Sequence, residues 1–275
     1  MKSARGEKRA QLPNFHALLF SALFLGLIGC TTSASPPTSL PESIPSISRD
    51  PGDLIKSLDQ RLVQFHSLRA LASVTYWGKD GRQGFQEAVV VRRPDRLRLE
   101  TLSPLGAILI VTADGQEVIG FHPREALFFR GKSSKENLLR YTQIPLELGE
   151  LTLLLMGLPP VEIQGHWEEK GNTVYRDISE GGRDVVAFDP RLVVPIQWER
   201  FRAGGGIELK AIFSDFASTP AGPFPSKISV EAPAQQRRVE IRYQEPELNV
   251  ILPSDLFVQE KPGNVKELPI ESLGG

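Results

Sequence analysis

One cysteine and four histidines are the residues of this 275-residue chain best suited to metal binding or nucleophilic chemistry. His66, His122 and His166 are widely separated and show neither the His-x-x-x-His nor the His-Glu-x-x-His spacing of zinc hydrolases. The sequence contains no Gly-x-Ser-x-Gly elbow, Walker A loop or strand-linked Gly-x-Gly-x-x-Gly. We therefore predict a protein that is not an enzyme and has no metal or cofactor, and an enzyme with dispersed catalytic residues stays the alternative.

The cysteine has a distinctive setting. Four basic residues near the N-terminus precede an almost wholly apolar run at residues 17–28, which is too short to span a bilayer, since that takes about 20 residues. The run ends in Leu27-Ile28-Gly29-Cys30, which resembles the lipobox of bacterial lipoproteins. The resemblance implies cleavage before Cys30 and acylation of its thiol. An ordinary signal peptide followed by a chance cysteine is the alternative.

The chain divides by composition into four parts. Residues 1–29 are the predicted signal peptide, and residues 30–49, rich in Pro, Ser and Thr, are a predicted tether. We expect one domain at residues 50–262 and a flexible tail at 263–275. Removing the signal peptide changes the formal net charge from -1 to -4, since four basic residues and one acidic residue are lost. This balance predicts no nucleic-acid partner.

The domain has the pattern of a curved antiparallel sheet. Apolar and polar residues alternate in many short segments, for example at 96–100, 207–213 and 238–243, which is typical of strands with one buried face. Residues 161–168 are a further strand candidate. An amphipathic helix is expected at 54–65 and two more helices near 133–141 and 145–155, with Gly157 ending the last one. The predicted class is mainly β: an unclosed antiparallel β-barrel with a few helices forming a lid.

One turn carries an unusual residue. Ser103-Pro104-Leu105-Gly106 lies between two predicted strands and has Pro and Gly where a type I turn favours them. Leu105 is thereby placed at a hairpin tip, where the core cannot cover it. Burying one Leu contributes roughly 1.5–3 kcal/mol, enough to favour docking on an apolar surface. Alternatively, Leu105 folds back over the sheet edge or is a harmless exposed residue.

The lipobox, tether, helix and strands, together with "RLRLETLSPLGAILIVTADGQEV" and "IPLELGELTLLLMGLPP", resemble the LolB family of outer-membrane lipoprotein receptors. The resemblance implies the LolA/LolB fold, with a cavity for acyl chains of lipoproteins handed over by a periplasmic LolA-like carrier. It implies a membrane-inserting loop at Pro104, Leu105 and Gly106. It also implies a lipid-anchored location at the periplasmic face of the outer membrane, supported by Thr31, since Asp after the cysteine commonly signals inner-membrane retention.

A concave sheet with one apolar face could line such a cavity. The candidate lining residues are Leu97, Leu99, Ile108, Ile110, Phe128, Trp198, Phe213, Ile228 and Tyr243. Periodicity alone does not separate cavity lining from solid core. The expected partners are acylated lipoprotein cargo, a LolA-like carrier and the outer-membrane bilayer, with the chain itself a monomer.

Two other functions stay open. The "LNVILPSDLFVQEKPGNV" segment extends beyond the expected end of the family and is similar to extensions in broader lipid-binding lipoproteins of the same fold. The chain could therefore bind a lipid or glycolipid during envelope transport. It could also be a non-transporting scaffold lipoprotein in an envelope complex.

Overall fold

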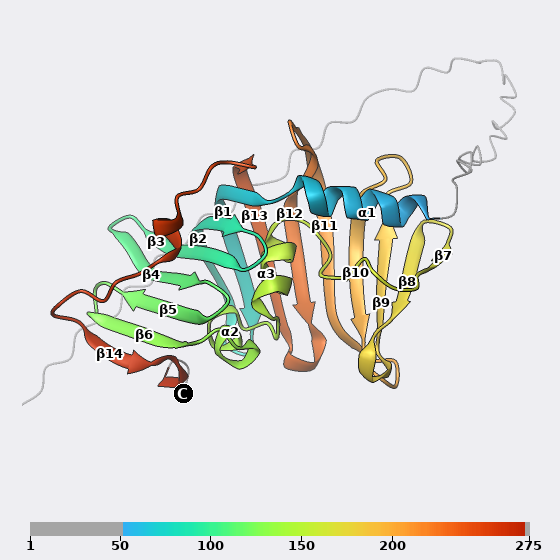
Figure 1. Ribbon diagram of the computed structural model, residues 1–275. Helices are drawn as coiled ribbons and strands as arrows, with labels where there is room; N and C mark the ends of the chain where they lie inside the picture. The colour runs from blue at the N-terminus through green and yellow to red at the C-terminus, as the bar shows by residue number, and fades with distance from the viewer. Residues whose placement is uncertain (1–51, 273–275) are drawn as a thin grey trace, which may run out of the picture. The chain divides into compact units, whose positions relative to one another are not determined.

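A single 14-stranded sheet dominates residues 52–272, the part of the chain that the computed structural model describes (Figure 1). Its order is β14-β6-β5-β4-β3-β2-β1-β13-β12-β11-β10-β9-β8-β7. Neighbours are antiparallel except β14 and β6, which are parallel. Within these residues the outermost strands, β14 and β7, do not pair with each other, so the sheet is not closed into a barrel. Cys30, the signal peptide and the tether lie outside the described residues.

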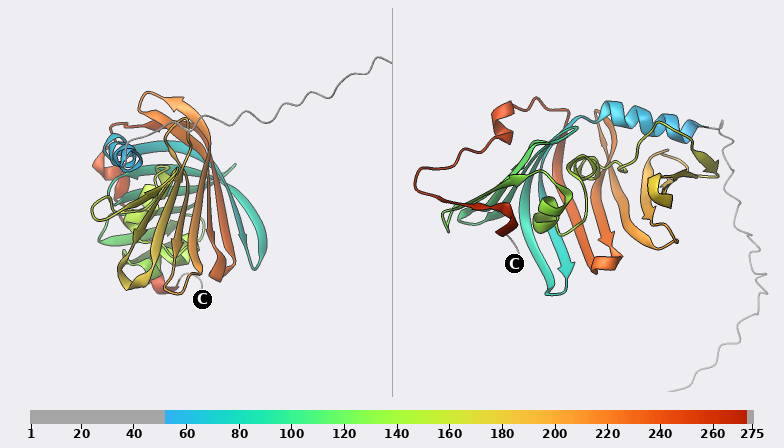
Figure 2. Two further views of the ribbon diagram at one scale, coloured as in Figure 1. Left: turned by 90° about the vertical axis from the view of Figure 1, so that its right-hand side faces the viewer. Right: turned by 60° about the horizontal axis from the view of Figure 1, so that its bottom comes forward.

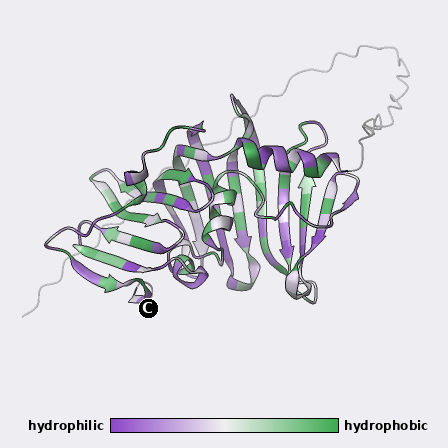
Figure 3. Cartoon of the chain, in the orientation of Figure 1, coloured by the Kyte–Doolittle hydropathy of each residue, from purple (hydrophilic) through white to green (hydrophobic). Residues whose placement is uncertain are grey.

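The strands match most of the predicted segments. They are β1 (Ser67–Gly78), β2 (Gly81–Arg92), β3 (Arg96–Ser103), β4 (Gly106–Ala113), β5 (Glu117–His122), β6 (Leu127–Lys132), β7 (Glu168–Lys170), β8 (Thr173–Asp177), β9 (Arg183–Phe188), β10 (Pro195–Phe201), β11 (Ile207–Thr219), β12 (Gly222–Ala232), β13 (Arg237–Leu248) and β14 (Lys266–Pro269). Figure 3 shows apolar and polar residues alternating along many of them. Because successive side chains point to opposite faces, this alternation buries one face of the sheet.

The first helix, α1 (Asp53–Gln64), crosses one end of the strands (Figure 1). Leu54 and Leu58, one turn apart, are fully buried. The guanidinium of Arg93 donates to the carbonyls of Leu62 and Phe65 at the helix C-terminus. Those carbonyls have no partner within the helix, and a cation there also favours the helix dipole.

Two eight-residue helices, α2 (Lys135–Thr142) and α3 (Leu148–Leu155), lie on the concave side of the sheet (Figure 2). The N-cap of α2 is Ser134, whose hydroxyl accepts from the backbone N–H of Asn137. At the end of α3, the N–H groups of Gly157 and Leu158 donate to the carbonyls of Leu154 and Leu153, which is a Schellman motif. Gly157 has φ 69° there, as predicted for a residue that ends a helix. The described residues thus confirm the predicted class, mainly β with few helices forming a lid.

Two segments differ from the sequence-based expectation. Residues 161–167 form no strand, because side chains and not a neighbouring strand bond their carbonyls: Arg176 donates to the Glu162 carbonyl at 2.7 Å, and Trp167 Nε1–H donates to the Ile163 carbonyl at 3.1 Å. The predicted flexible tail is ordered as far as residue 272. Its strand β14 pairs with β6, and Ile270 is buried because its side chain packs against Gly131. The domain therefore continues beyond residue 262.

Candidate functional site

A cavity of about 700 Å³ lies between the concave face of the sheet and the two helices α2 and α3. Its wall consists of side chains from β1–β4, β12 and β13, and its roof consists of residues 140–155. The apolar lining includes Val74, Val89, Leu99, Leu109, Leu151, Leu154, Ile228 and Ile241. Pockets that bind small ligands in proteins are typically about 300–1,000 Å³ and mostly apolar. The volume and lining therefore suit an apolar ligand.

Helix α3 supplies much of the roof. Its sequence, LGELTLLL, carries apolar side chains on every face, which is typical of a helix buried on all sides. Leu151, Leu154 and Leu155 line the cavity. The end of the helix is held by Tyr243 of β13, whose hydroxyl donates to the Leu155 carbonyl at 2.8 Å.

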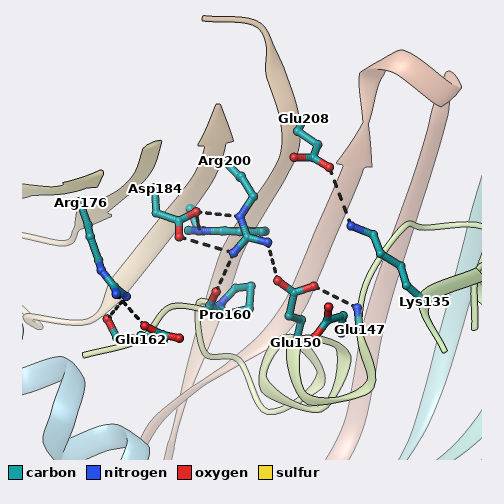
Figure 4. Close-up of polar contacts among 10 residues, drawn as sticks. Lys135, Glu147, Glu150, Pro160, Glu162, Arg176, Asp184, Arg200 and Glu208 are labelled. Atoms are coloured by element: carbon teal, nitrogen blue, oxygen red, sulfur yellow. Dashed lines mark hydrogen bonds and ion pairs between the residues drawn. The ribbon is translucent and has the colours of Figure 1, made fainter. Parts of the chain in front are cut away.

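An ionic network holds the other end of α3 to the sheet (Figure 4). Glu150 of α3 pairs with Arg200 of β10, which also pairs with Asp184 of β9 at 3.0 Å. Asp184 is 1% exposed, and burial raises its pKa even though Arg200 opposes the shift. The second oxygen of Glu150 accepts from the backbone N–H of Glu147 at 3.0 Å. The roof is thus fixed to β9 and β10.

The cavity has one buried carboxyl group. Glu87 of β2 is 3% exposed, and its oxygens accept from the hydroxyls of Tyr141 in α2 at 2.8 Å and Thr101 in β3 at 3.0 Å. Burial raises the pKa of Glu87 to about 7, Glu100 adds to the rise, and the two hydroxyl hydrogen bonds oppose it. The sequence reasoning missed Glu87. Its place in the alternation of β2 could have identified it, because Phe85, Glu87 and Val89 share the inward face of that strand.

The cavity is more polar near the β1–β2 hairpin. Asp80 and Gln83 line it there and are exposed, and Arg237 of β13 approaches from the neighbouring strand. The guanidinium of Arg237 stacks over the ring of Tyr76, with Cζ 5.5 Å from the ring centroid. An amphiphile can therefore meet apolar side chains inside the cavity and charged groups at this end.

Two of the nine predicted lining residues, Leu99 and Ile228, line the cavity. The other seven are not among its lining residues: Leu97, Ile108, Ile110, Phe128, Trp198, Phe213 and Tyr243. Most of the seven are buried elsewhere. Trp198 and Phe213, for example, pack in the core over β10 and β11 and are at most 1% exposed. Ile108 and Ile110 are only half-buried. The leucines of α3 line the cavity, but they were predicted only as helix residues.

The turn at 103–106 is the tight hairpin between β3 and β4. Leu105 at its tip is 84% exposed, so it does not fold back over the sheet edge. The Ser103 hydroxyl accepts from the Leu105 backbone N–H at 3.2 Å and donates to the Gly106 carbonyl at 2.9 Å. These two bonds fix the turn, and Gly106 adopts φ 103°, which favours glycine. The exposed leucine is therefore held on a rigid turn.

Within residues 52–272, no three His, Cys, Asp or Glu side chains are grouped so that they could hold a metal ion. No helix in the same range is long and apolar enough to cross a bilayer.

Comparison with known proteins gives matches at the level of structure. No family model and no curated protein sequence matches the chain. A putative outer membrane lipoprotein-sorting protein domain from Vibrio parahaemolyticus superposes with a TM-score of 0.52 at 9% identity, covering 74% of this chain and 95% of the other. A LolA superfamily protein from Nitrosomonas europaea gives 0.50 at 13% identity, covering 75% and 96%. The described domain therefore has the fold of LolA-superfamily proteins.

Proposed function

We propose that this chain binds acyl chains in the cavity beneath α2 and α3 and, as a lipoprotein anchored through Cys30, delivers acylated lipoproteins from a LolA-like carrier to the outer membrane. The cavity of about 700 Å³ with its apolar wall is the observation that carries the proposal. Exposing a 16-carbon chain to water costs about 13 kcal/mol, at about 0.8 kcal/mol per CH₂. A protein that transfers such chains must therefore shelter them.

Leu105 supports the delivery step. An apolar residue that is 84% exposed on a fixed turn can enter the bilayer surface. Since burying one Leu contributes only about 1.5–3 kcal/mol, this contact is reversible, whereas acylation of Cys30 would supply lasting attachment. The chain carries no nucleotide-binding motif. Differences in binding free energy would thus drive the transfer, from the protein that binds the cargo more weakly to the one that binds it more strongly.

Two neighbouring leucines of β3 provide a matched test of acyl binding. Leu99 lines the cavity, whereas Leu97, two residues away on the same face, is buried outside it. Leu99→Trp should place an indole in the cavity and lower the affinity for a lauroyl probe about tenfold, with little loss of stability. Leu97→Trp should overpack the core, costing about 1–3 kcal/mol, and leave the affinity of the folded fraction unchanged. Unchanged lauroyl affinity in Leu99→Trp would contradict the proposal.

The delivery step is tested in a reconstituted transfer of lipoprotein from carrier to liposomes. Leu105→Glu should slow delivery while leaving lauroyl binding intact. Ile251→Glu is the matched control, because Ile251 is 98% exposed but lies near the opposite ends of the strands. Equal delivery by Leu105→Glu and the wild type would remove the hairpin from the mechanism.

A further inference from the structure

Glu87 breaks the apolar pattern of the cavity wall. Its neighbours on the inward face of β2, Phe85 and Val89, also line the cavity. Within residues 52–272, no ion pair engages Glu87, and the charged group that shifts its pKa is Glu100, whose carboxylate is itself paired with Arg98 at 2.6 Å. A buried carboxyl group without a basic partner costs stability. Departures of this kind from the local pattern are found most often at functional sites.

The carboxyl group is oriented by two elements. The hydroxyl of Tyr141 in the roof donates to one oxygen, and the hydroxyl of Thr101 in the adjacent strand donates to the other. Each carboxylate oxygen has two lone pairs, so each keeps one for a further donor. The two hydroxyl oxygens can accept as well. The cluster of Glu87, Tyr141 and Thr101, which we call the carboxyl subsite, therefore presents acceptors to the cavity.

We propose that the carboxyl subsite selects acyl ligands whose polar end donates a hydrogen bond, such as the hydroxyl of a monoacylglycerol or the N–H of an acyl amide, over fatty-acid anions. The inference rests on the proposed acyl-binding function and adds the ligand class. A hydroxyl or N–H placed beside Glu87 satisfies a spare lone pair. A carboxylate placed there meets a like charge in an apolar surrounding, where such repulsion is poorly screened.

The test is calorimetric titration of the full chain at pH 8 with three lauroyl probes: monolauroylglycerol, lauramide and laurate. At this pH Glu87 is mostly ionised, since its pKa is about 7. The glycerol and amide probes should each bind about tenfold more tightly than laurate, the effect of one hydrogen bond to a charged group. If only one of them does, that probe names the donor that the subsite accepts.

Substitutions assign the selection to the subsite. Glu87→Gln keeps the size of the side chain and should bring the three affinities within about twofold, mainly by improving laurate binding. Glu87→Leu should do the same without any polar atom. Glu125→Gln makes the same carboxyl-to-amide change at an exposed position outside the lining of the cavity and should leave the ratio unchanged.

The outcomes separate the two proposals. Equal binding of all three probes by the wild type, or an unchanged ratio in Glu87→Gln, would overturn the carboxyl subsite while acyl binding stands. Absence of binding by every probe would overturn both.

Discussion

The inner face of the sheet is solid over β8–β11 and hollow over β1–β4, β12 and β13. In the packed region the apolar side chains of Val186, Trp198, Leu209 and Phe213 are at most 1% exposed. In the hollow region the same inward alternation lines a cavity of about 700 Å³. The strands of both regions follow one rule of alternation, so the difference arises from what covers them.

Helix α1 covers one end of the packed region, and irregular chain covers the rest. Residues 156–161 follow α3, and Met156 and Leu158 are fully buried. Irregular chain can follow a concave surface closely. Two short helices such as α2 and α3 contact the sheet along only part of their surfaces, which leaves space beneath them. Four changes test this contrast, in order of expected effect.

Trp198→Ala should cause the largest loss. The indole is fully buried, and its Nε1–H donates to Asp184 at 3.1 Å. We expect the free energy of unfolding in urea to fall by about 3–5 kcal/mol. Leu151→Ala in the cavity roof should cost only about 1–2 kcal/mol, because that side chain already faces space. Equal losses at the two positions would contradict the distinction between the packed and hollow regions.

Asp184→Ala should cost about 2–4 kcal/mol, because it leaves both Trp198 and Arg200 without their buried acceptor. Thermal unfolding at pH 7 is the measurement. Asp177→Ala is the control, since Asp177 pairs with Arg183 at 2.6 Å on the exposed surface, and its loss should leave stability unchanged. A milder effect at Asp184 than at Asp177 would show that the network does not fix the roof.

Glu87→Gln should change the pH dependence of stability. Burial raises the folded-state pKa of Glu87 from 4.5 to about 7, so the folded chain keeps a proton that the unfolded chain releases. The resulting stabilisation is complete below the unfolded pKa and is lost as the pH rises through about 7. Between pH 5 and pH 8 the wild type should therefore lose on the order of 2 kcal/mol relative to Glu87→Gln.

Urea unfolding at several pH values measures this difference. The free energy of unfolding of Asp80→Asn, a change at the exposed end of the cavity, should depend on pH in the same way as that of the wild type. Parallel curves for Glu87→Gln and the wild type would show that the carboxyl group is not buried as the structure places it.

Gly157→Ala should have the smallest effect, about 1–2 kcal/mol. The residue joins the roof of the hollow region to the chain that covers the packed region. Its φ is 69°, and a Cβ there would lie 2.5 Å from Pro225 Cγ. Gly206→Ala meets nothing within 4 Å and has no positive φ, so denaturation of that variant should match the wild type. Similar stability of the two alanine variants would show that the backbone at residue 157 can shift to accommodate a Cβ.

Sequence patterns identified most of the elements but little of the cavity. Alternation in β3 predicted a strand with Leu97 and Leu99 inward, and both are buried. Which of them faces empty space depends on where α2 and α3 rest, and the local sequence of β3 carries no information about that. Glu87 was overlooked for a similar reason, because a single charge in a strand is usually solvated and only its burial makes it unusual.

Local sequence patterns were enough to predict most of the strands, the helices, the tight turn at residues 103–106 and the end of α3 at Gly157. These features depend on periodicity and on the backbone preferences of nearby residues. The three-dimensional arrangement was needed to see that β1–β4, β12 and β13 line a cavity and β8–β11 do not, that β14 joins the sheet, and that Leu105 stays exposed. Those outcomes depend on contacts between residues distant in the chain, such as Tyr141 with Glu87 and Glu150 with Arg200.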